Sequence, residues 1–251
     1  MGDRMRRGVL LGVPFLTLCV WITSTHADNR SDTVETGRLL AILLDCGRVT
    51  ISAHQSLIND PEKGHKGFTG DVFERHLLAT FQTRTRIDLT HLDQAPVPAI
   101  ARPLLARLIE ESKKTVDSYQ PAINVPGLKY KGLNPATFGT ETATRFQSWS
   151  GVYMKQTAPI GLVRNPKNKP DEFEIGALEK LEHSASKSGD EILSETMGDT
   201  SVRILLPLFY SKTCLGCHGE PKGERDISGY PREGKKEGDL GGAISVKLDL
   251  K

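Results

Sequence analysis

Five consecutive residues near the C-terminal end carry the clearest chemistry in the chain, Cys214-Leu215-Gly216-Cys217-His218. Two cysteines at this spacing, followed at once by a histidine, form the CxxCH attachment pattern of c-type haem. Each thiol can add to one vinyl group of the same porphyrin, and the histidine is then placed to bind the iron from one face. The motif therefore predicts one covalent haem c, with His218 as the proximal ligand.

A CxxC pair also occurs in dithiol redox proteins and in zinc sites. A redox pair of the thioredoxin type usually opens a helix early in a βαβ unit, whereas this pair lies close to the C-terminus. A zinc site needs two further ligands at suitable spacing, and the sequence has no second CxxC and no HxxxH. Haem attachment is therefore the favoured prediction, with dithiol or metal chemistry as its rivals.

The N-terminal residues have the three parts of a secretory signal peptide. Arg4, Arg6 and Arg7 make the first residues positively charged, and residues 8–22 are apolar. Thr25 and Ala27 are small residues at the usual cleavage spacing. The apolar run is shorter than the ~20 residues that a membrane-spanning helix needs. Because bacteria attach c-type haem after export, the leader and the CxxCH motif support each other. The sequence thus predicts a leader over 1–27 and a periplasmic haem domain over 28–251, with an uncleaved anchor as the alternative.

The charges are balanced, with 33 basic and 31 acidic residues in the whole chain and 30 of each after residue 27. This balance argues against nucleic acid and against an anionic membrane surface as partners. We expect a soluble or loosely membrane-associated protein whose partner is a separate redox protein. The sequence is also compatible with a homodimer. The length suits one domain.

Cysteine usage leaves one thiol without an assigned role. Of the four cysteines, Cys19 lies in the expected leader, and Cys214 and Cys217 belong to the haem motif. Cys46 then stands alone in an exported protein, with no cysteine left to pair with. From the residues alone it is either a small buried core thiol or a second ligand of the iron.

The first half of the chain has helical periodicity. A long helix is expected over 33–59, followed by helices over 72–83, 103–119 and 136–148, with Thr69 or Asp71 as a cap before the second. The long helix carries one stripe of apolar or small residues that should be buried: Leu39, Ile42, Leu43, Cys46, Val49, Ala53 and Leu57.

After Gly151 the pattern changes to strands. Alternation over 152–160 predicts a strand, residues 164–168 a turn, and residues 171–183 a helix. Strands follow over 191–197 and 201–210, joined by a hairpin at Gly198-Asp199, and over 243–248. Helices followed by an antiparallel meander indicate an α+β architecture, with the helices on one face of the sheet.

Several motifs, in this order, resemble the PAS-like single-haem c-type proteins, a family long catalogued as a domain of unknown function. They are the long N-terminal helix ending in Ile58-Asn59-Asp60, then Lys66-Gly67-Phe68-Thr69, Arg164-Asn165-Pro166-Lys167-Asn168, Asp171-Glu172-Phe173-Glu174, the CxxCH motif with Gly219, and Gly241-Gly242-Ala243-Ile244-Ser245-Val246. The resemblance spans roughly residues 33–248. It implies a PAS-like fold with a five-stranded antiparallel sheet, and related domains occur as sensor modules of histidine kinases and chemoreceptors.

A cyanobacterial member of that family has His/Cys axial ligation, and the resemblance places the thiolate on the long N-terminal helix, which makes Cys46 the candidate distal ligand. The competing ligands are better explained as surface or packing residues: His54, His65, His76, Met154 and Met197. Arg164 and Asn165, with Asn168, are candidates for binding haem propionates or a small ligand. The alternative for this segment is a turn held by side-chain–backbone hydrogen bonds. Arg203 and Lys212 are the other propionate candidates.

These residues predict a six-coordinate, low-spin haem, and a thiolate ligand would lower its reduction potential. The favoured function is a low-potential one-electron carrier. The alternative is a periplasmic redox or gas sensor that signals through a separate partner. The sequence shows no acid–base pair typical of a peroxidase or reductase, so an enzyme is the least favoured interpretation.

Overall fold

The computed structural model describes residues 22–184 and 188–250. The expected leader lies largely outside the described residues, and from Ile22 onward the backbone is already part of helix α1. In chain order the larger elements are α1 (Ile22–Ala53), α2 (Gln55–Asn59), α3 (Gly70–Thr85), α4 (Ala101–Ser118), α5 (Gln120–Ile123), α6 (Pro135–Ser150), β1 (Tyr153–Thr157), α7 (Glu172–His183), β2 (Leu193–Met197), β3 (Ser201–Phe209), α8 (Leu215–His218) and β4 (Leu240–Asp249). Each expected helix and strand is found with shifted ends, except that the single helix expected over 33–59 is divided at His54 into α1 and α2.

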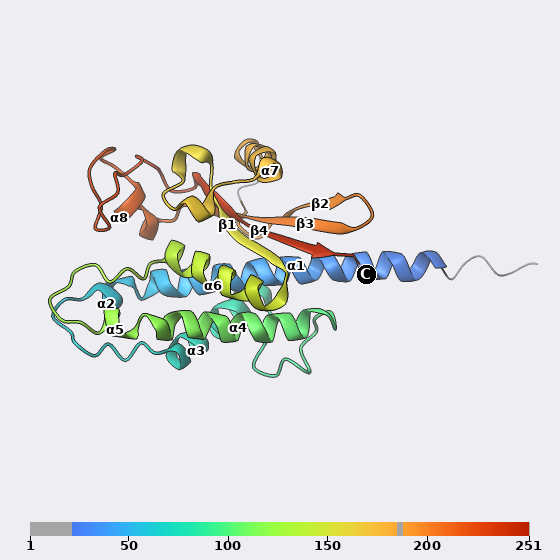
Figure 1. Cartoon of the computed structure of the whole chain (residues 1–251), viewed down its shortest axis with the longest axis horizontal. Coiled ribbons are helices and arrows are strands. Elements are labelled where there is room, and N and C mark those ends of the chain that lie inside the picture. Colours follow the sequence, from blue (N-terminus) through green and yellow to red (C-terminus); the bar gives the residue numbers. More distant parts are fainter. Residues whose placement is uncertain (1–21, 185–187, 251) are drawn as a thin grey trace, which may run out of the picture.

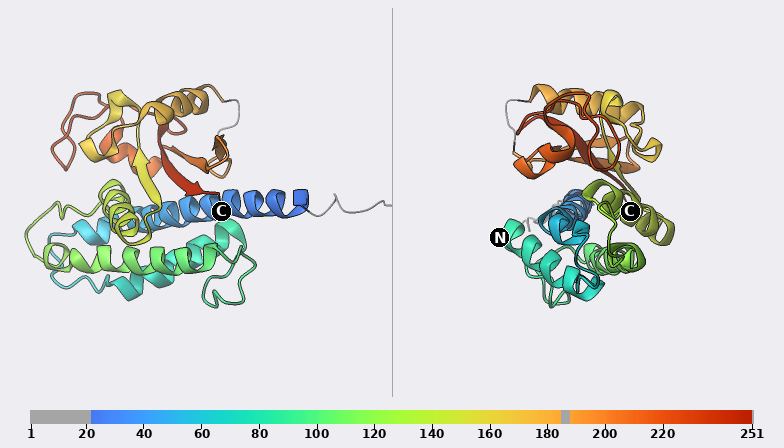
Figure 2. Two further views of the ribbon diagram at one scale, coloured as in Figure 1. Left: turned by 45° about the vertical axis from the view of Figure 1, so that its right-hand side comes forward. Right: turned by 90° about the vertical axis from the view of Figure 1, so that its left-hand side faces the viewer.

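The elements form three layers (Figures 1 and 2). Helices α1, α3, α4 and α6 make a bundle on one face of the sheet, and α7 covers the other face. A second small core lies under α7, made of Ala177, Leu178, Leu181, Leu205, Leu240 and Ala243. The expectation that helices cover only one face is therefore wrong, because α7 has an apolar side of its own to bury.

The sheet is antiparallel, with strand order β1-β4-β3-β2. The described residues form four strands, one fewer than the resemblance implies. The described chain before β1 is helical or irregular, so it supplies no strand to the β1 edge. Pro207 lies within β3 but beyond the end of β2, where β3 has a strand on one side only. This placement is where proline is tolerated in a sheet.

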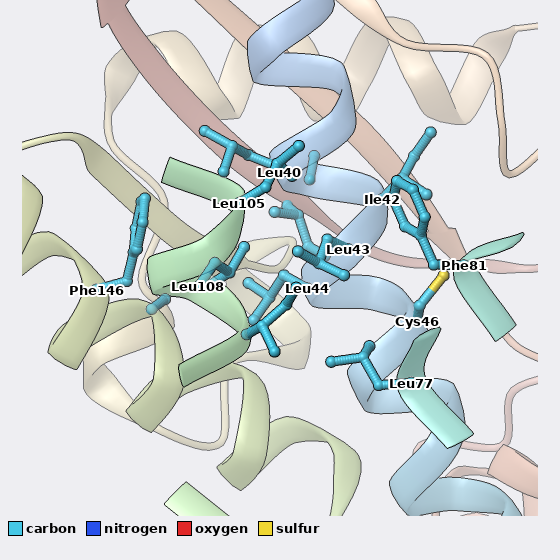
Figure 3. Packing of buried hydrophobic residues seen from close by; sticks show 14 of the residues in the cluster. Leu40, Ile42, Leu43, Leu44, Cys46, Leu77, Phe81, Leu105, Leu108 and Phe146 are labelled. Atoms are coloured by element: carbon cyan, nitrogen blue, oxygen red, sulfur yellow. The ribbon is translucent and has the colours of Figure 1, made fainter. Parts of the chain in front are cut away.

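Helix α1 is the centre of the bundle (Figure 3). Its residues from Leu39 to Leu44 are at most 1 % exposed, so the helix is buried all round rather than along one stripe. Two residues of the stripe that was expected to be buried are instead exposed. They are Val49, which is 47 % exposed, and Ala53. At this end α1 is no longer surrounded on every side. Among the helices of the described chain, none has the length and apolar character required to cross a membrane.

Local sequence signals explain several element ends. Thr69 caps α3 by accepting a hydrogen bond from the backbone N–H of Val72, as the sequence suggested. Asp171 and Glu174 form a capping box at the start of α7. The Gly241-Gly242 pair permits close packing. A Cβ on Gly241 would press on the ring of Tyr210, and Gly242, with a φ of 155°, lies against the Thr157 carbonyl of β1.

Candidate functional site

The CxxCH motif follows directly after β3, at one end of the sheet. A short turn of helix η3 (Lys212–Cys214) leads into α8, so both cysteines lie on consecutive helical turns. Residues three apart on a helix are neighbours on one side, which brings the two thiols to the same side. Both cysteines are free and half-buried. Burial raises the pKa of the Cys217 thiol.

The residue after the histidine ends this short helix. Gly219 donates its backbone N–H to the Leu215 carbonyl at 2.9 Å. A Cβ on Gly219 would lie 2.7 Å from that carbonyl oxygen, closer than real Cβ atoms approach. The glycine is therefore needed for the chain to turn away immediately after His218.

Arg164 ties three segments together beside the motif. Its Nη1 donates to Asp226 at 2.7 Å, its Nε to Glu233 at 2.7 Å, and its Nη2 to the carbonyl of Cys217 at 2.9 Å. The Asp226 side chain is fully buried. Burial alone would lower the pKa of Arg164, but its hydrogen bonds to the two carboxylates outweigh that effect and the pKa is raised. Arg164 therefore holds the CxxCH turn and the 226–233 loop in one arrangement.

His218 has a defined environment. Its Nδ1 lies 2.8 Å from Glu233 Oε2, its ring lies against Tyr210 with centroids 4.9 Å apart, and its carbonyl accepts the N–H of Lys235. Burial, and next the charge of Arg164, lower the pKa of His218. The pKa of Glu233 is also lowered, since its bonds from Arg164 and His218 outweigh burial. When this imidazole is neutral, the carboxylate can only accept the proton of Nδ1, which leaves Nε2 as a basic nitrogen able to bind a metal.

Helix α1 borders the motif through one side-chain contact. Ser52 Oγ donates to Thr213 Oγ1 at 3.1 Å, immediately before Cys214. Val49 lies three residues earlier and so occupies a neighbouring position on the same side of α1. It is one of the large apolar residues left exposed. Val49 therefore presents an exposed apolar side chain one helical turn from this contact, where it could pack against the edge of a porphyrin.

Cys46 lies in a different environment. It is fully buried, and Figure 3 shows its sulfur directed toward Phe81 of α3, with Leu77 close by. Burial raises its pKa to about 12, although Arg84 opposes this rise. Cys46 lies about 120° around α1 from Ser52 and roughly 9 Å away along the axis, from ~100° and 1.5 Å per residue. Its charged neighbours are Arg84, Asp45 and Asp190, whereas those of His218 are Arg164, Glu233 and Asp226, so in this arrangement the two side chains share no such neighbour.

The competing ligands lie mostly where the sequence suggested. His65 and His76 are exposed, and Met154 is packed in the core. His54 is half-buried, stacks on Phe68 and has its Nδ1 2.8 Å from the Thr50 carbonyl. Met197, for which packing was expected, is 41 % exposed because β2 is an edge strand.

The 164–168 segment is a turn in which Asn165 bonds the backbone, as the alternative interpretation stated, whereas the side chains of Arg164 and Asn168 bond other segments. Asn165 Oδ1 accepts the backbone N–H of Lys167 and caps the short helix η2 (Pro166–Asn168). Asn168 is buried and bonds Thr140. Arg203 is buried under α7 against Asp171 and Glu174, so it is not positioned as a propionate partner.

Sequence reasoning missed three residues around His218: Tyr210, Asp226 and Glu233. The two acids occur in a loop rich in glycine and lysine, where charged side chains usually face solvent. Their partner Arg164 is more than sixty residues earlier in the chain. The one sequence signal for the position of these two acids was the cluster of turn-forming residues around them, which indicates that their loop is compact.

Comparison with known proteins gives the family. The model of the Tll0287-like family matches residues 101–248, more than half of the chain. The chain belongs to the Tll0287-like family. The resemblance found in the sequence is thereby confirmed for this stretch, which contains Arg164 and CxxCH. Cys46 lies outside the matched residues.

One solved structure, described as the crystal structure of the cyanobacterial heme-protein Tll0287, aligns with 16 % sequence identity and a TM-score of 0.41. The alignment covers 59 % of this chain and 92 % of that chain. At this distance the Tll0287-like relative gives no residue-by-residue correspondence. A search of the curated proteins gives no match.

Proposed function

We propose that this Tll0287-like protein is exported and carries one haem c, bound covalently through Cys214 and Cys217, with His218 as the proximal ligand. The observation that carries the proposal is the arrangement of His218. It follows two half-buried thiols on consecutive helical turns, and its Nδ1 is bonded to Glu233, which leaves Nε2 for the iron. Membership of the Tll0287-like family, which shares its name with a cyanobacterial heme-protein, supports the choice of cofactor.

When bound, the haem supplies a one-electron Fe(III)/Fe(II) couple. The chain's own residues hold it at the surface end of the sheet. Cys214 and Cys217 would hold the ring through thioether bonds, Arg164 holds the turn that carries these cysteines, and the exposed side chain of Val49 on α1 would be available to pack against the ring. We propose a one-electron carrier that exchanges electrons with a separate redox protein, because the motif is only half-buried and the ring would lie close to the molecular surface.

The sixth ligand is a separate hypothesis. Cys46 is the thiol that the family resemblance favours, and metal binding can deprotonate a thiol whatever its free pKa. Its packing against α3 supports a role in the core instead. Ligation by Cys46 requires α3 to move away from the side of α1 that carries this cysteine. Covalent attachment through Cys214 and Cys217 does not depend on Cys46.

The packed position of Cys46 favours one alternative function. If Cys46 stays in the core, one face of the iron is open to a small ligand. The protein would then suit a haem-based gas or redox sensor that acts through another protein.

Spectra of the reduced protein with and without CO test the two functions. A six-coordinate, low-spin haem that resists CO supports the electron carrier, and rapid CO binding supports the sensor. Replacing Cys46 with alanine tests the sixth ligand. A higher midpoint potential and a newly open site would support Cys46 ligation, whereas an unchanged spectrum and potential would exclude it. Export is tested by the N-terminal sequence of the periplasmic protein, which should begin at residue 28.

A further inference from the structure

One carboxylate contacts the imidazole of the CxxCH motif. Glu233 lies fifteen residues after His218, and its Oε2 is 2.8 Å from Nδ1. An ionised carboxylate can only accept hydrogen bonds, so the proton of the neutral imidazole must be on Nδ1. The other ring nitrogen, Nε2, then keeps its lone pair.

Glu233 is itself held from two directions. Arg164 binds both of its oxygens, with Nε at 2.7 Å from Oε1 and Nη2 at 3.0 Å from Oε2. The next residues are fixed to the histidine backbone, because Lys235 donates its N–H to the His218 carbonyl at 2.8 Å. A bidentate pair with arginine restricts both the position and the plane of the carboxylate. Glu233 is therefore fixed in position relative to the imidazole.

We propose that Glu233 is the positioning residue of the haem's proximal ligand. It fixes His218 in the Nδ1–H tautomer, sets the orientation of the ring, and lowers the reduction potential of the iron. This inference rests on the proposed function. A carboxylate on the far nitrogen of a metal-bound histidine increases the basicity of that ligand and so favours the ferric state. Arg164 shares the same carboxylate and so limits the size of the effect.

A purely structural role is the competing explanation, since Glu233 also completes the Arg164 pair that holds the loop. The two roles differ in what the variant Glu233→Gln changes. Glutamine keeps the size and one acceptor oxygen for Arg164, but it lacks the charge. Loss of a structural contact would lower stability and leave the ligand unchanged, whereas loss of the positioning role would change the iron.

The test is the midpoint potential of the holo-protein. Glu233→Gln should still carry covalent haem, and its reduction equilibrium should shift at least tenfold toward the ferrous form, which is about 59 mV for one electron. Glu237→Gln is the matched control, because Glu237 is exposed on the same loop and the charge change is identical. Equal potentials in the wild type and Glu233→Gln would overturn the proposal. Absence of haem from the wild type would instead overturn the proposed function.

A second readout uses the full-length chain without haem, made by replacing Cys214 and Cys217 with alanine. Nitrogen NMR of the His218 ring should show the Nδ1–H tautomer in this background. Adding Glu233→Gln should give a mixture of tautomers or the Nε2–H form, and adding Glu237→Gln should change nothing. The same tautomer with and without the Glu233 carboxylate would contradict the positioning role.

Discussion

Replacing Arg164 with alanine is expected to lower the free energy of unfolding by about 2–4 kcal/mol. Breaking a buried ion pair costs about 3–5 kcal/mol, because the remaining charge is left unpaired, whereas an exposed pair contributes about 0–1 kcal/mol. The Asp226 side chain is fully buried, Glu233 is 16 % exposed and Arg164 is 19 % exposed. Partial exposure of the arginine screens the interaction, which places the expected loss below the fully buried range.

Urea unfolding followed by circular dichroism measures this loss, with haem attached in every variant. For a domain of this size, each 1 kcal/mol lowers the melting temperature by about 2–4 °C, so the expected decrease is roughly 4–16 °C. Arg164→Lys should recover only part of the stability, because lysine keeps the charge but lacks the planar fork that binds two carboxylates.

Arg232→Ala is the matched control, an arginine in the 226–233 loop that Arg164 holds. Arg232 pairs with Glu224 at 3.6 Å, and that glutamate is 56 % exposed, so the ion pair itself should contribute less than about 1 kcal/mol. A similar loss in Arg164→Ala and Arg232→Ala, or a loss under about 1 kcal/mol in Arg164→Ala, would refute the role of Arg164 in holding the CxxCH turn.

Two further predictions concern the fold around the sheet. Gly242→Ala should cost at least about 1–3 kcal/mol in urea unfolding, because its φ of 155° is strained for alanine and the new Cβ would collide with the Thr157 carbonyl. Gly176→Ala on α7 has open space and should gain up to about 1 kcal/mol, so equal effects of the two substitutions would contradict backbone strain at residue 242. Asp171 has a lowered pKa, because bonds from the α7 backbone and Arg203 outweigh burial. The contribution of the Asp171 carboxylate to folding stability is therefore complete above its unfolded-state pKa of about 3.9, and it disappears as the pH falls through its lower folded-state pKa. Asp171→Asn should flatten the loss of stability below about pH 4, and an unchanged acid profile would count against it.

Local signals were sufficient to predict most of the elements. The cap Thr69 and the hairpin glycine Gly198 act through residues nearby in sequence, so their spacing alone indicates an element end. The burial of α1 was predicted only in part. A one-stripe pattern describes a helix at a surface, whereas α1 has helices and the sheet around it.

The candidate site shows the same limit. CxxCH could be found because its chemistry depends on five adjacent residues. The surroundings of His218 could not, since Glu233, Asp226 and Arg164 meet through contacts between distant segments. Burial of Cys46 was predicted correctly, but periodicity does not specify which neighbouring element a buried side chain faces.

Covalent attachment of haem tests the central claim most directly. The full-length chain, expressed in a bacterium that attaches c-type haem after export, should give a protein heavier than its polypeptide by one haem. After proteolysis, that mass should remain on the peptide that contains Cys214 and Cys217. Replacing both cysteines with alanine should remove it, while replacing Cys46 should leave it in place. An exported wild-type protein with both thiols free, or with haem lost on denaturation, would contradict covalent attachment at CxxCH.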